Sequence, residues 1–333
     1  MPRPPFKKRL MRDVFRCISL LNAPVYLWPY FSREAGAEYG VGFFRKARLL
    51  WSMFRNRFRI VTASGFLDHV VMVTEILKIP RDVRGVVVEC GSYQGGSTVN
   101  FSLVCAMVGR ELHVFDSFAG LPEPSEAEKL HKVLSIRNIS TFQKGDWCGT
   151  IEVVTENIRR YGNLSVCRFH QGYFDQTLPQ FREPVVFVFC DVDLRTSLEP
   201  CVENLWPLLQ DHRMLFTHEA HHMEIAGLFF EPEWWQSRNL GKTPPGLVGG
   251  GSGIGLYVSD KGRFQSALGF AVKNLQVTDL ASSGPEAAPW PVVVRPVLAH
   301  EAHFDNSGNL DGPPSVTASA ALRDTQCGSR QAG

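Results

Sequence analysis

The sequence predicts an α/β fold, a doubly wound and mostly parallel β-sheet preceded by a helical N-terminal extension. From residue 64 onward, short and nearly continuous apolar runs alternate with helical patterns. Strands of this kind are buried on both faces, as in parallel sheets covered by helices. The chain has 333 residues and is 44% hydrophobic, which is enough for one large core with appendages.

Five strands and three helices are expected in the main domain, residues 64–300. The expected strands are residues 85–90, 111–115, 164–169, 185–190 and 214–217. The expected helices are residues 96–109, 150–161 and 197–210. The glycine-rich segment 242–255 is either a mobile lid or a linker to a last strand. Residues 301–333 have little to bury and are expected to be disordered.

Residues 1–63 form the basic N-terminal extension, with thirteen Lys and Arg against three Asp and Glu. Within it, residues 41–58 alternate apolar and basic residues at helical spacing. We favour a helix packed on its own domain over an interfacial helix on a membrane. The charge still leaves a peripheral membrane contact open.

Charge and cysteine content restrict the class of protein. The formal net charge of +2 argues against nucleic acid as a partner. The eight cysteines include no C-x-x-C pair, which suits a reducing, cytoplasmic setting. No apolar run reaches the roughly 18 residues of a membrane span, and the N-terminus has no clear signal peptide.

The stretch VVVECGSYQGGSTVNFS, residues 86–102, is expected to be a strand, a glycine-rich turn and the start of a helix. Ligands of open α/β sheets bind beyond the carboxyl ends of strands. An acid and free helix N–H groups suit the ammonium and carboxylate of S-adenosylmethionine, and a plain tight connection is the alternative. The candidate cofactor-binding residues are Glu89, Gly91, Tyr93, Gly95 and Ser97.

Two further strand ends extend this predicted cofactor site. Asp116 lies 27 residues beyond Glu89, and a carboxylate there can accept hydrogen bonds from both ribose hydroxyls. A helix cap or Asx turn before Ser117 is the alternative. Gly172 and Phe174 follow the third strand and can wall the adenine, although Phe174 can also be an ordinary core aromatic.

Polar residues after the fourth and fifth strands form a second candidate cluster. Asp191 and Asp193 follow one strand, while His218 and Glu219 follow the next. If the two strands are neighbours, Asp191, His218 and Glu219 meet and can hold a divalent metal with open positions. A helix cap and a polar loop are the alternative.

These motifs, in this order, resemble the macrocin O-methyltransferase family. The resemblance rests on VVVECGSYQGGST, HVFDSFAGLPEP, FHQGYFDQTLP and DVDLRTSLEPCVENLWPLL, and it covers roughly residues 65–225. It implies a class I methyltransferase (Rossmann-like) sheet and an S-adenosylmethionine-dependent enzyme that methylates sugar hydroxyls. The cofactor site would include Glu89, Gly91, Ser97, Asp116, Ser117 and Gly172.

The resemblance also implies metal ligands at Asp191 and after the fifth strand, and a general base at Asp193. The family usually has Asp-Asp-Tyr where this chain has His218, Glu219 and Ala220. The resemblance implies Mg²⁺, and the histidine gives the ligand set a softer character. The family also has Tyr in place of Arg195, which bears on the substrate wall. His221 and His222 are further candidates for the base.

The sequence therefore predicts an O-methyltransferase that acts on a sugar or glycosylated small molecule, or on a glycan, with help from a divalent metal. A nicotinamide or nucleotide-sugar enzyme on a similar sheet is one alternative, and the missing G-x-G-x-x-G argues against it. A relative that has lost its activity is the other.

Overall fold

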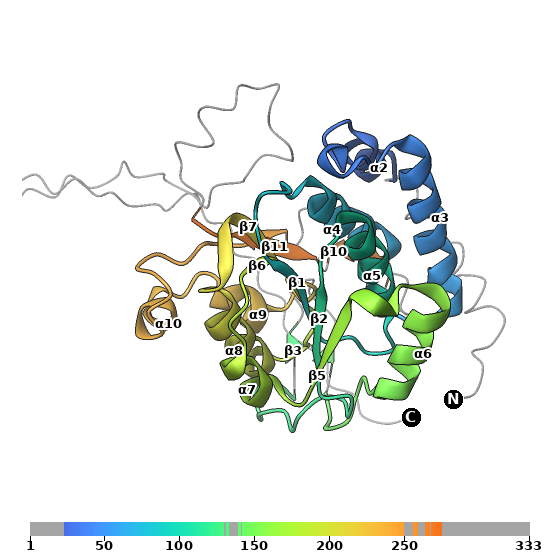
Figure 1. Cartoon of the computed structure of the whole chain (residues 1–333). Coiled ribbons are helices and arrows are strands. Elements are labelled where there is room, and N and C mark those ends of the chain that lie inside the picture. The colour runs from blue at the N-terminus through green and yellow to red at the C-terminus, as the bar shows by residue number, and fades with distance from the viewer. Residues whose placement is uncertain are drawn as a thin grey trace, which may run out of the picture. The chain divides into compact units, whose positions relative to one another are not determined.

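A seven-stranded sheet forms the centre of the structure, a computed structural model that describes residues 23–129, 131–132, 139–140, 142–249, 256–258, 264–266 and 268–274. The strand order is β5-β2-β1-β6-β7-β11-β8 (Figure 1). The strands are β1 (Val86–Cys90), β2 (Leu112–Asp116), β5 (Cys167–Gln171), β6 (Val185–Cys190), β7 (Leu209–Thr217), β8 (Val248–Gly249) and β11 (Gly269–Val272). Neighbours from β5 to β7 are parallel, and β11 is antiparallel to both its neighbours. The predicted doubly wound, mostly parallel sheet is confirmed.

The direction in which the chain adds strands reverses between β1 and β6. From β1 the chain adds β2 and then β5 on one side, and it returns to the other side of β1 to add β6 and β7. Both β1 and β6 are buried along their whole length, as their unbroken apolar runs predict. Such a switch point leaves a crevice beyond the carboxyl ends of the two strands.

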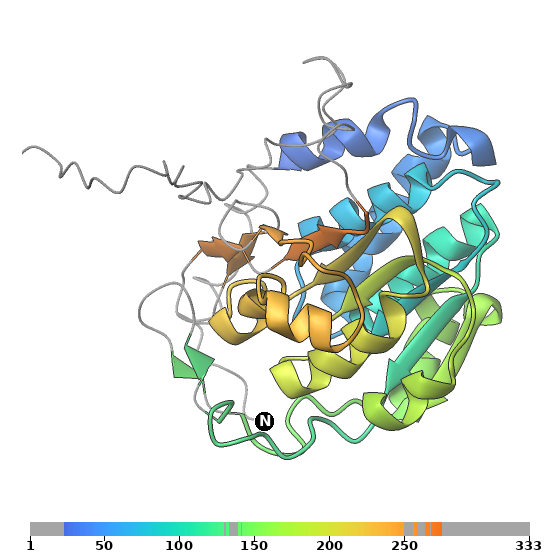
Figure 2. The same ribbon diagram turned by 90° about the vertical axis from the view of Figure 1, so that its left-hand side faces the viewer.

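Helices cover both faces of the sheet (Figure 1 and Figure 2). One face carries α4 (Phe66–Lys78), α5 (Gly96–Val108) and α6 (Ile151–Tyr161), and the other carries α7 (Phe174–Thr177), α8 (Arg195–Leu205), α9 (Met223–Leu228) and α10 (Pro232–Ser237). Successive residues of β1 point to opposite faces: Val87 packs in the cluster of α4 and α5, and Val88 in that of α8.

The N-terminal extension packs on the face of α4 and α5. It contains α2 (Ala23–Phe31), the short turn η2 (Ala37–Tyr39) and α3 (Phe43–Arg59), which is the helix expected at residues 41–58. Tyr30, Leu49 and Met53 are buried in the same cluster as Val87 of β1. The extension therefore shares the core of the sheet. In the described part of the chain, no helix is both long enough and apolar enough to cross a membrane.

Two expected elements are displaced by local turns. The expected strand 164–169 is β5, which begins at Cys167 because residues 164–166 form a 3-10 turn; Oδ1 of Asn163 accepts a hydrogen bond from Ser165 N of 3.0 Å at its start. The expected helix 197–210 ends at Leu205. The chain then enters β7, whose first residue already pairs with β6. Polar residues early in β7 hid this strand from the sequence pattern.

The glycine-rich segment is only partly described. Its residues 242–249 lead into β8, and residues 250–255 lie outside the described part of the chain. Two short antiparallel pairs stand apart from the main sheet: β9 (Leu256–Val258) with β10 (Phe264–Ser266), and β3 (His131–Lys132) with β4 (Ile139–Ser140). The tail 301–333, predicted to be disordered, also lies outside the described residues.

Candidate active site

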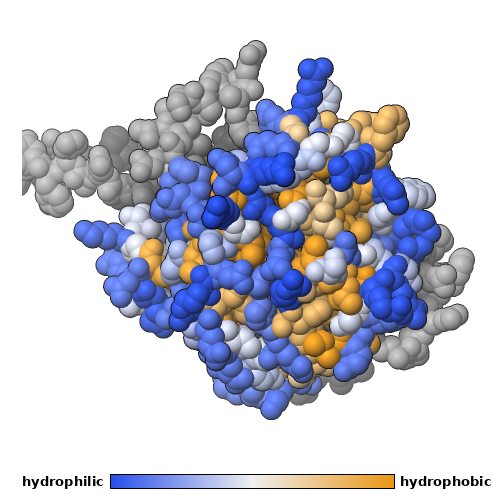
Figure 3. Space-filling view, in the orientation of Figure 1, coloured by the Kyte–Doolittle hydropathy of each residue, from blue (hydrophilic) through white to orange (hydrophobic). Residues whose placement is uncertain are grey.

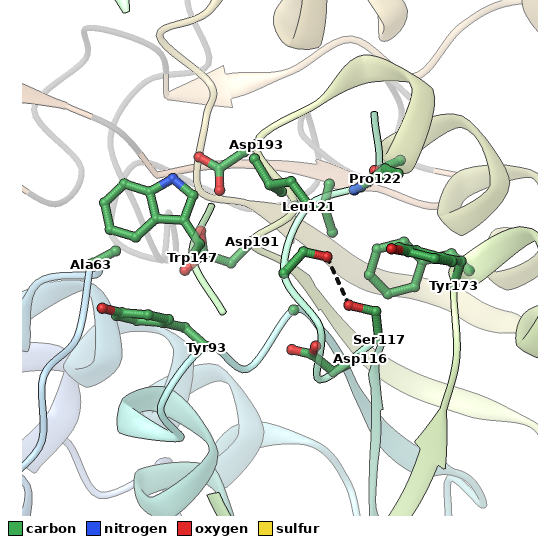
Figure 4. Close-up of a pocket in the computed structure, with 15 residues that line it drawn as sticks. Ala63, Tyr93, Asp116, Ser117, Leu121, Pro122, Trp147, Tyr173, Asp191 and Asp193 are labelled. Carbon is green, nitrogen blue, oxygen red and sulfur yellow. Dashed lines mark hydrogen bonds between the residues drawn. The ribbon is translucent and has the colours of Figure 1, made fainter. Parts of the chain in front are cut away.

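A cavity opens beyond the carboxyl ends of β1, β2 and β6, at the switch point of the sheet (Figure 4). It encloses about 570 Å³ of empty space, which includes solvent at its open mouth. Five predicted cofactor residues line it: Gly91, Tyr93, Asp116, Ser117 and Phe174. Both aspartates of the D-x-D motif, Asp191 and Asp193, line it as well.

Gly91 allows the ends of β1 and β6 to meet beneath the cavity. Its φ is 86°, and a Cβ atom there would lie 2.0 Å from the carbonyl oxygen of Asp191. The Asp191 N–H donates to the carbonyl of Cys90 over 2.9 Å, which holds the two strand ends together. The sequence pattern suggested a glycine for close approach to a ligand. The structure shows close approach of two backbones.

Four predicted cofactor residues do not line the cavity: Glu89, Gly95, Ser97 and Gly172. Glu89 is completely buried, and burial raises the pKa of its carboxyl to about 8 against the effect of the nearby hydroxyls of Ser97 and Thr98. Gly172 donates its N–H to the carbonyl of Asp116 over 2.9 Å, which joins the ends of β5 and β2. Contact between these four residues and a cofactor stays a prediction.

Asp116 joins the end of β2 to the turn after β1. Its Oδ2 accepts hydrogen bonds from the N–H and the hydroxyl of Ser92, at 2.6 and 2.8 Å. Its Oδ1 accepts a bond of 2.7 Å from the N–H of Phe118, which is the Asx turn that the sequence left open. Burial raises the pKa of Asp116 although these bonds oppose the shift. Asp116 therefore both organises two loops and faces the cavity.

Tyr93 and Trp147 form an aromatic wall of the cavity (Figure 4). Their ring centroids are 5.5 Å apart and the rings meet edge to face at 88°. Both backbones are left-handed, with φ of 48° and 56°, a strain of about 1–3 kcal/mol each that packing must hold in place. Gly149 packs against the strained backbone of Tyr93 and holds it in place. A Cβ at Gly149 would lie 1.7 Å from the Tyr93 carbonyl oxygen. Trp147 lies in a loop without periodicity, and the sequence analysis missed it.

The opposite wall is largely apolar and includes Leu121, Tyr173 and Phe174. The Ser117 hydroxyl donates to the carbonyl of Gly120 over 2.8 Å, the dashed line in Figure 4, and so fixes the loop that carries Leu121. Tyr173 was not predicted, because a residue between two motif positions gives no signal of its own.

Asp191, His218 and Glu219 form a buried cluster at the ends of β6 and β7. His218 Nδ1 lies 3.4 Å from Asp191 Oδ1 and 3.1 Å from Glu219 Oε1. One possible ligand atom of each residue lies within 4.8 Å of the others. The parallel pairing of β6 with β7 produces this convergence. Of the three, only Asp191 lines the cavity.

This cluster contains its own positive charge. Burial alone would lower the pKa of His218, but the charge and hydrogen bond of Asp191 raise it well above its usual value. Burial alone would raise the pKa of Asp191, but the charge and hydrogen bond of His218 lower it. Burial and the charge of Asp191 raise the pKa of Glu219 well above its usual value. The shifts therefore favour a positive charge on His218 and a negative charge on Asp191, and they disfavour a second negative charge on Glu219.

Asp193 lines the cavity from a strained backbone, with φ of 60°. Burial and then the charge of Asp191 raise the pKa of Asp193 to about 7. A carboxyl with a pKa near neutrality can both take up and release a proton under ordinary conditions. The other two candidate bases, His221 and His222, do not line the cavity.

Asp68 is a buried acid that the sequence analysis missed. It lies in the first turn of α4, where Oδ2 accepts a bond of 2.8 Å from the N–H of Gly65. The same Oδ2 lies 3.9 Å from His218 Nε2, on the side of the imidazole away from Asp191. Burial raises the pKa of Asp68 to about 6. Asp68 does not follow a predicted strand, so the sequence gives no reason to place it at the site. Only the folding of the chain brings it there.

Arg195, expected at the substrate wall, does not line the cavity. Its guanidinium donates to both carboxylate oxygens of Glu231, at 2.7 and 2.6 Å, and to Glu199 at 2.8 Å. Arg195 thus ties the start of α8 to the residue before α10. Ser197 is the residue of α8 that reaches the cavity.

Residues 64–214 match the family described as macrocin-O-methyltransferase (TylF). The matched segment contains every residue that lines the cavity except Ala63. No curated protein is similar enough in sequence to match the chain.

Several solved structures are similar to this chain at low sequence identity. The O-methyltransferase NovP is 17% identical, with 61% of this chain and 77% of that chain covered and a TM-score of 0.45. CalS11, a calicheamicin methyltransferase, is 15% identical, with coverage of 58% and 71% and a TM-score of 0.36. An O-methyltransferase from Bacillus cereus in complex with SAH is 14% identical, with coverage of 68% and 91% and a TM-score of 0.38.

Likenesses as distant as these carry no argument about activity. The assignment rests on the family match, which spans the cavity, and on the order of motifs that resembles the same family. Residues 64–214 of the chain thus match the macrocin O-methyltransferase family, and this match identifies the chain as a methyltransferase.

Proposed function

We propose that the chain transfers the methyl group of S-adenosylmethionine to a hydroxyl of a sugar or glycosylated small molecule. The observation that carries the proposal is the convergence of Asp116, Asp191 and Asp193 on one cavity at the switch point. Acidic groups around a cavity favour a ligand with a sulfonium and an ammonium group. They disfavour the pyrophosphate of NAD or of a nucleotide sugar, which needs an open helix N-terminus. Here the first residues of α5 do not line the cavity.

The ribose and the adenine of this methyl donor have candidate partners in the cavity, and the methionyl group has candidate partners beside it. Asp116, Tyr173 and Phe174 line the cavity. In the proposed complex, Asp116 would accept hydrogen bonds from the ribose hydroxyls, and the two aromatic residues would offer apolar surface to the adenine. Glu89 and Ser97 remain candidates for the methionyl group, because they flank the turn that carries the cavity residues of β1.

Asp191, His218 and Glu219 have the donor set of a divalent metal site. Two carboxylates and one imidazole lie within 4.8 Å of one another. Oxygen ligands suit Mg²⁺ and Mn²⁺, and the imidazole widens the choice toward softer ions. A divalent ion bound there would act as a Lewis acid that lowers the pKa of a coordinated acceptor hydroxyl.

Asp193 is the residue that we assign as the general base. It reaches the cavity, and its pKa of about 7 lets it accept a proton at neutral pH. The acceptor oxygen bonds to the methyl carbon as the carbon–sulfur bond breaks. The hydroxyl proton goes to Asp193, and S-adenosylhomocysteine is left. The protein mainly aligns the two reactants.

A sugar is the acceptor class that the family description and the cavity mouth support. The matching family is described by the O-methylation of macrocin, and the family that the motifs resemble methylates sugar hydroxyls. The cavity mouth carries Trp147, a large aromatic side chain with 46% of its surface exposed. Its ring offers an apolar face against which a sugar ring can pack beside Asp193.

Calorimetry with S-adenosylhomocysteine and with NAD tests the proposed donor. Saturable binding of S-adenosylhomocysteine, weakened in Asp116→Ala, is expected, and NAD is expected not to bind. Preferential binding of NAD would support the nicotinamide alternative. Labelled methyl transfer to a panel of glycosylated acceptors then separates an active enzyme from an inactive relative.

A further inference from the structure

We infer that the outer face of α3 docks onto an anionic membrane surface. The helix runs over 17 residues from Phe43 to Arg59. It contains six Lys and Arg and no Asp or Glu. One side of the helix packs on α4 and α5, so its other side is held in a fixed orientation.

One stripe of α3 points away from the protein. We define the α3 stripe as Phe44, Arg48, Trp51, Arg55 and Phe58. These positions are spaced by four, three, four and three residues, so they lie on one helix face. The three aromatic side chains are 87%, 59% and 65% exposed, and both arginines are exposed. The stripe therefore alternates aromatic and cationic side chains along the helix.

Exposed apolar side chains gather at this end of the described chain. Eleven large hydrophobic side chains are exposed among the described residues, and seven of them lie in residues 25–61. The seven are Val25, Trp28, Phe43, Phe44, Trp51, Phe58 and Val61. Figure 3 shows apolar residues at the surface over this end, between strongly hydrophilic ones. A concentration of this kind marks an interaction surface, whereas single exposed residues do not.

Ring contacts join the aromatic side chains of α3 into two groups, one at each end of the helix. Phe43 and Phe44 meet edge to face with centroids 5.7 Å apart. Phe54 links Trp51 to Phe58, with centroid distances of 5.9 and 5.3 Å. The aromatic residues of the stripe thus belong to two aromatic groups, with the exposed Arg48 between them.

Charge indicates which occupant fits the stripe. A second copy of the chain related by two-fold symmetry would set basic residues against basic residues, since α3 contains no acid. Among the described residues, Arg48 and Arg55 form no ion pair with an acidic side chain, so both remain available to an external anion. Aromatic rings buried at headgroup depth, with Arg at anionic headgroups, are typical of interfacial helices.

The α3 stripe and the cavity are joined by a short connection. The chain passes from Arg59 at the end of α3 to Ala63, which lines the cavity (Figure 4). Docking would hold the cavity mouth near the bilayer, where an acceptor presented at a membrane could enter. This last step rests on the proposed methyl transfer, whereas the docking itself does not.

Vesicle co-sedimentation of the full chain tests the docking. Phosphatidylcholine vesicles are compared with vesicles that also contain phosphatidylglycerol, at low and high salt. We expect binding only to the anionic vesicles, weakened by salt. Arg48→Glu/Arg55→Glu and Phe44→Ser/Trp51→Ser/Phe58→Ser should each reduce the bound fraction by about tenfold or more.

Arg81→Glu/Arg84→Glu is the matched control. These arginines are exposed before β1, outside the α3 stripe, and the change in net charge is the same as in Arg48→Glu/Arg55→Glu. The control should bind nearly as the unaltered chain does. Absence of vesicle binding, or equal loss in the control, would overturn the inference. So would a dimer in sedimentation velocity that the stripe variants dissociate. Binding of S-adenosylhomocysteine by each variant is the separate readout for the proposed function.

Discussion

Asp191 Oδ1 and His218 Nδ1 lie 3.4 Å apart at the ends of two paired parallel strands, and Glu219 Oε1 approaches the same nitrogen from 3.1 Å. A buried imidazole with two carboxyl groups at one nitrogen is stable only if a cation occupies that position. In the present structure a proton on His218 is that cation, because the pKa of His218 is raised well above its usual value. A divalent metal would compete with that proton for the same atom.

Binding of Mn²⁺ is therefore expected to release about one proton or more per ion at neutral pH, since metal ligands must be deprotonated. The raised pKa values of His218 and Glu219 make both residues sources of that proton. Calorimetry of Mn²⁺ binding in buffers of different ionisation enthalpy measures the number released. Asp191→Asn should abolish binding, and Glu199→Gln, in the ion pair of α8, should leave it unchanged. Tight binding without proton release would contradict the assignment of His218 as a ligand.

Asp193→Asn is expected to lower kcat by about 10²–10⁴-fold, because the variant can no longer accept the hydroxyl proton. Binding of S-adenosylhomocysteine should not change, since the amide keeps the size of the side chain. Labelled methyl transfer and calorimetry measure the two effects separately. Asp175→Asn changes an exposed acid on α7 and serves as the control. Turnover equal to that of the control would remove Asp193 as the base.

Asp68→Asn is expected to weaken Mn²⁺ binding by about 10–100-fold, the usual effect of losing a partner of a ligating histidine. The carboxylate lies 3.9 Å from Nε2 of His218 and can hold the imidazole with Nδ1 toward the metal. The Asn side chain can still accept the N–H of Gly65, so the start of α4 should survive. Glu75→Gln on the same helix is the control. Unchanged Mn²⁺ affinity in a folded Asp68→Asn protein would argue against this positioning role.

The sequence could predict those residues of the site that follow apolar runs. Asp116, Asp191 and His218 each come at or directly after the end of such a run, and parallel strands deliver their ends to one edge of a sheet. Asp68 and Trp147 could not be found in this way. One lies in a helix and the other in a loop, and only tertiary packing brings them to the cavity or its floor.

The same limit applies to the fold. Buried parallel strands are visible as unbroken apolar runs, whereas the first half of β7 is polar and is defined only by pairing with its neighbour. The extension was visible as a basic helix, but its docking is not. The packing of the extension on the sheet includes contacts between distant residues, such as the hydrogen bond of 3.0 Å between the Asn56 and Asn100 side chains, residues 44 apart in the chain.

Gly91→Ala is expected to destabilise the protein far more than Gly109→Ala. Both glycines are left-handed, with φ of 86° and 66°, so each substitution carries a conformational cost of about 1–2 kcal/mol. The added Cβ at position 91 would also overlap the Asp191 carbonyl at 2.0 Å, whereas nothing lies within 4 Å at position 109. Urea unfolding should show an extra loss of about 2 kcal/mol or more for Gly91→Ala. Equal losses would mean that the ends of β1 and β6 separate easily.

His69 is expected to make the protein less stable as the pH falls below its unfolded-state pKa. Burial, and then the charge of His218, lowers its pKa from 6.5 to about 4. Its ring lies between two hydrogen-bond partners, Ser64 at 2.7 Å and Asn100 at 2.8 Å. The Asn100 oxygen accepts from Asn56, so its amide nitrogen donates to Nδ1 of His69 and the neutral ring is the form that fits.

The unfolded chain therefore binds a proton at His69 between pH 6.5 and about 4 while the folded chain does not. Over that interval His69 costs about 3 kcal/mol of stability in total, and above pH 6.5 it costs nothing. Asp68 acts in the opposite direction, because its folded pKa is raised from 3.8 to about 6. Unfolding of the unaltered protein alone cannot separate the contributions of His69 and Asp68 to the pH dependence of its stability. Urea unfolding of the unaltered chain and of His69→Gln should give stability curves that converge toward acid pH and run parallel above pH 6.5. A constant difference across the whole range would show that His69 is not held neutral in the folded protein.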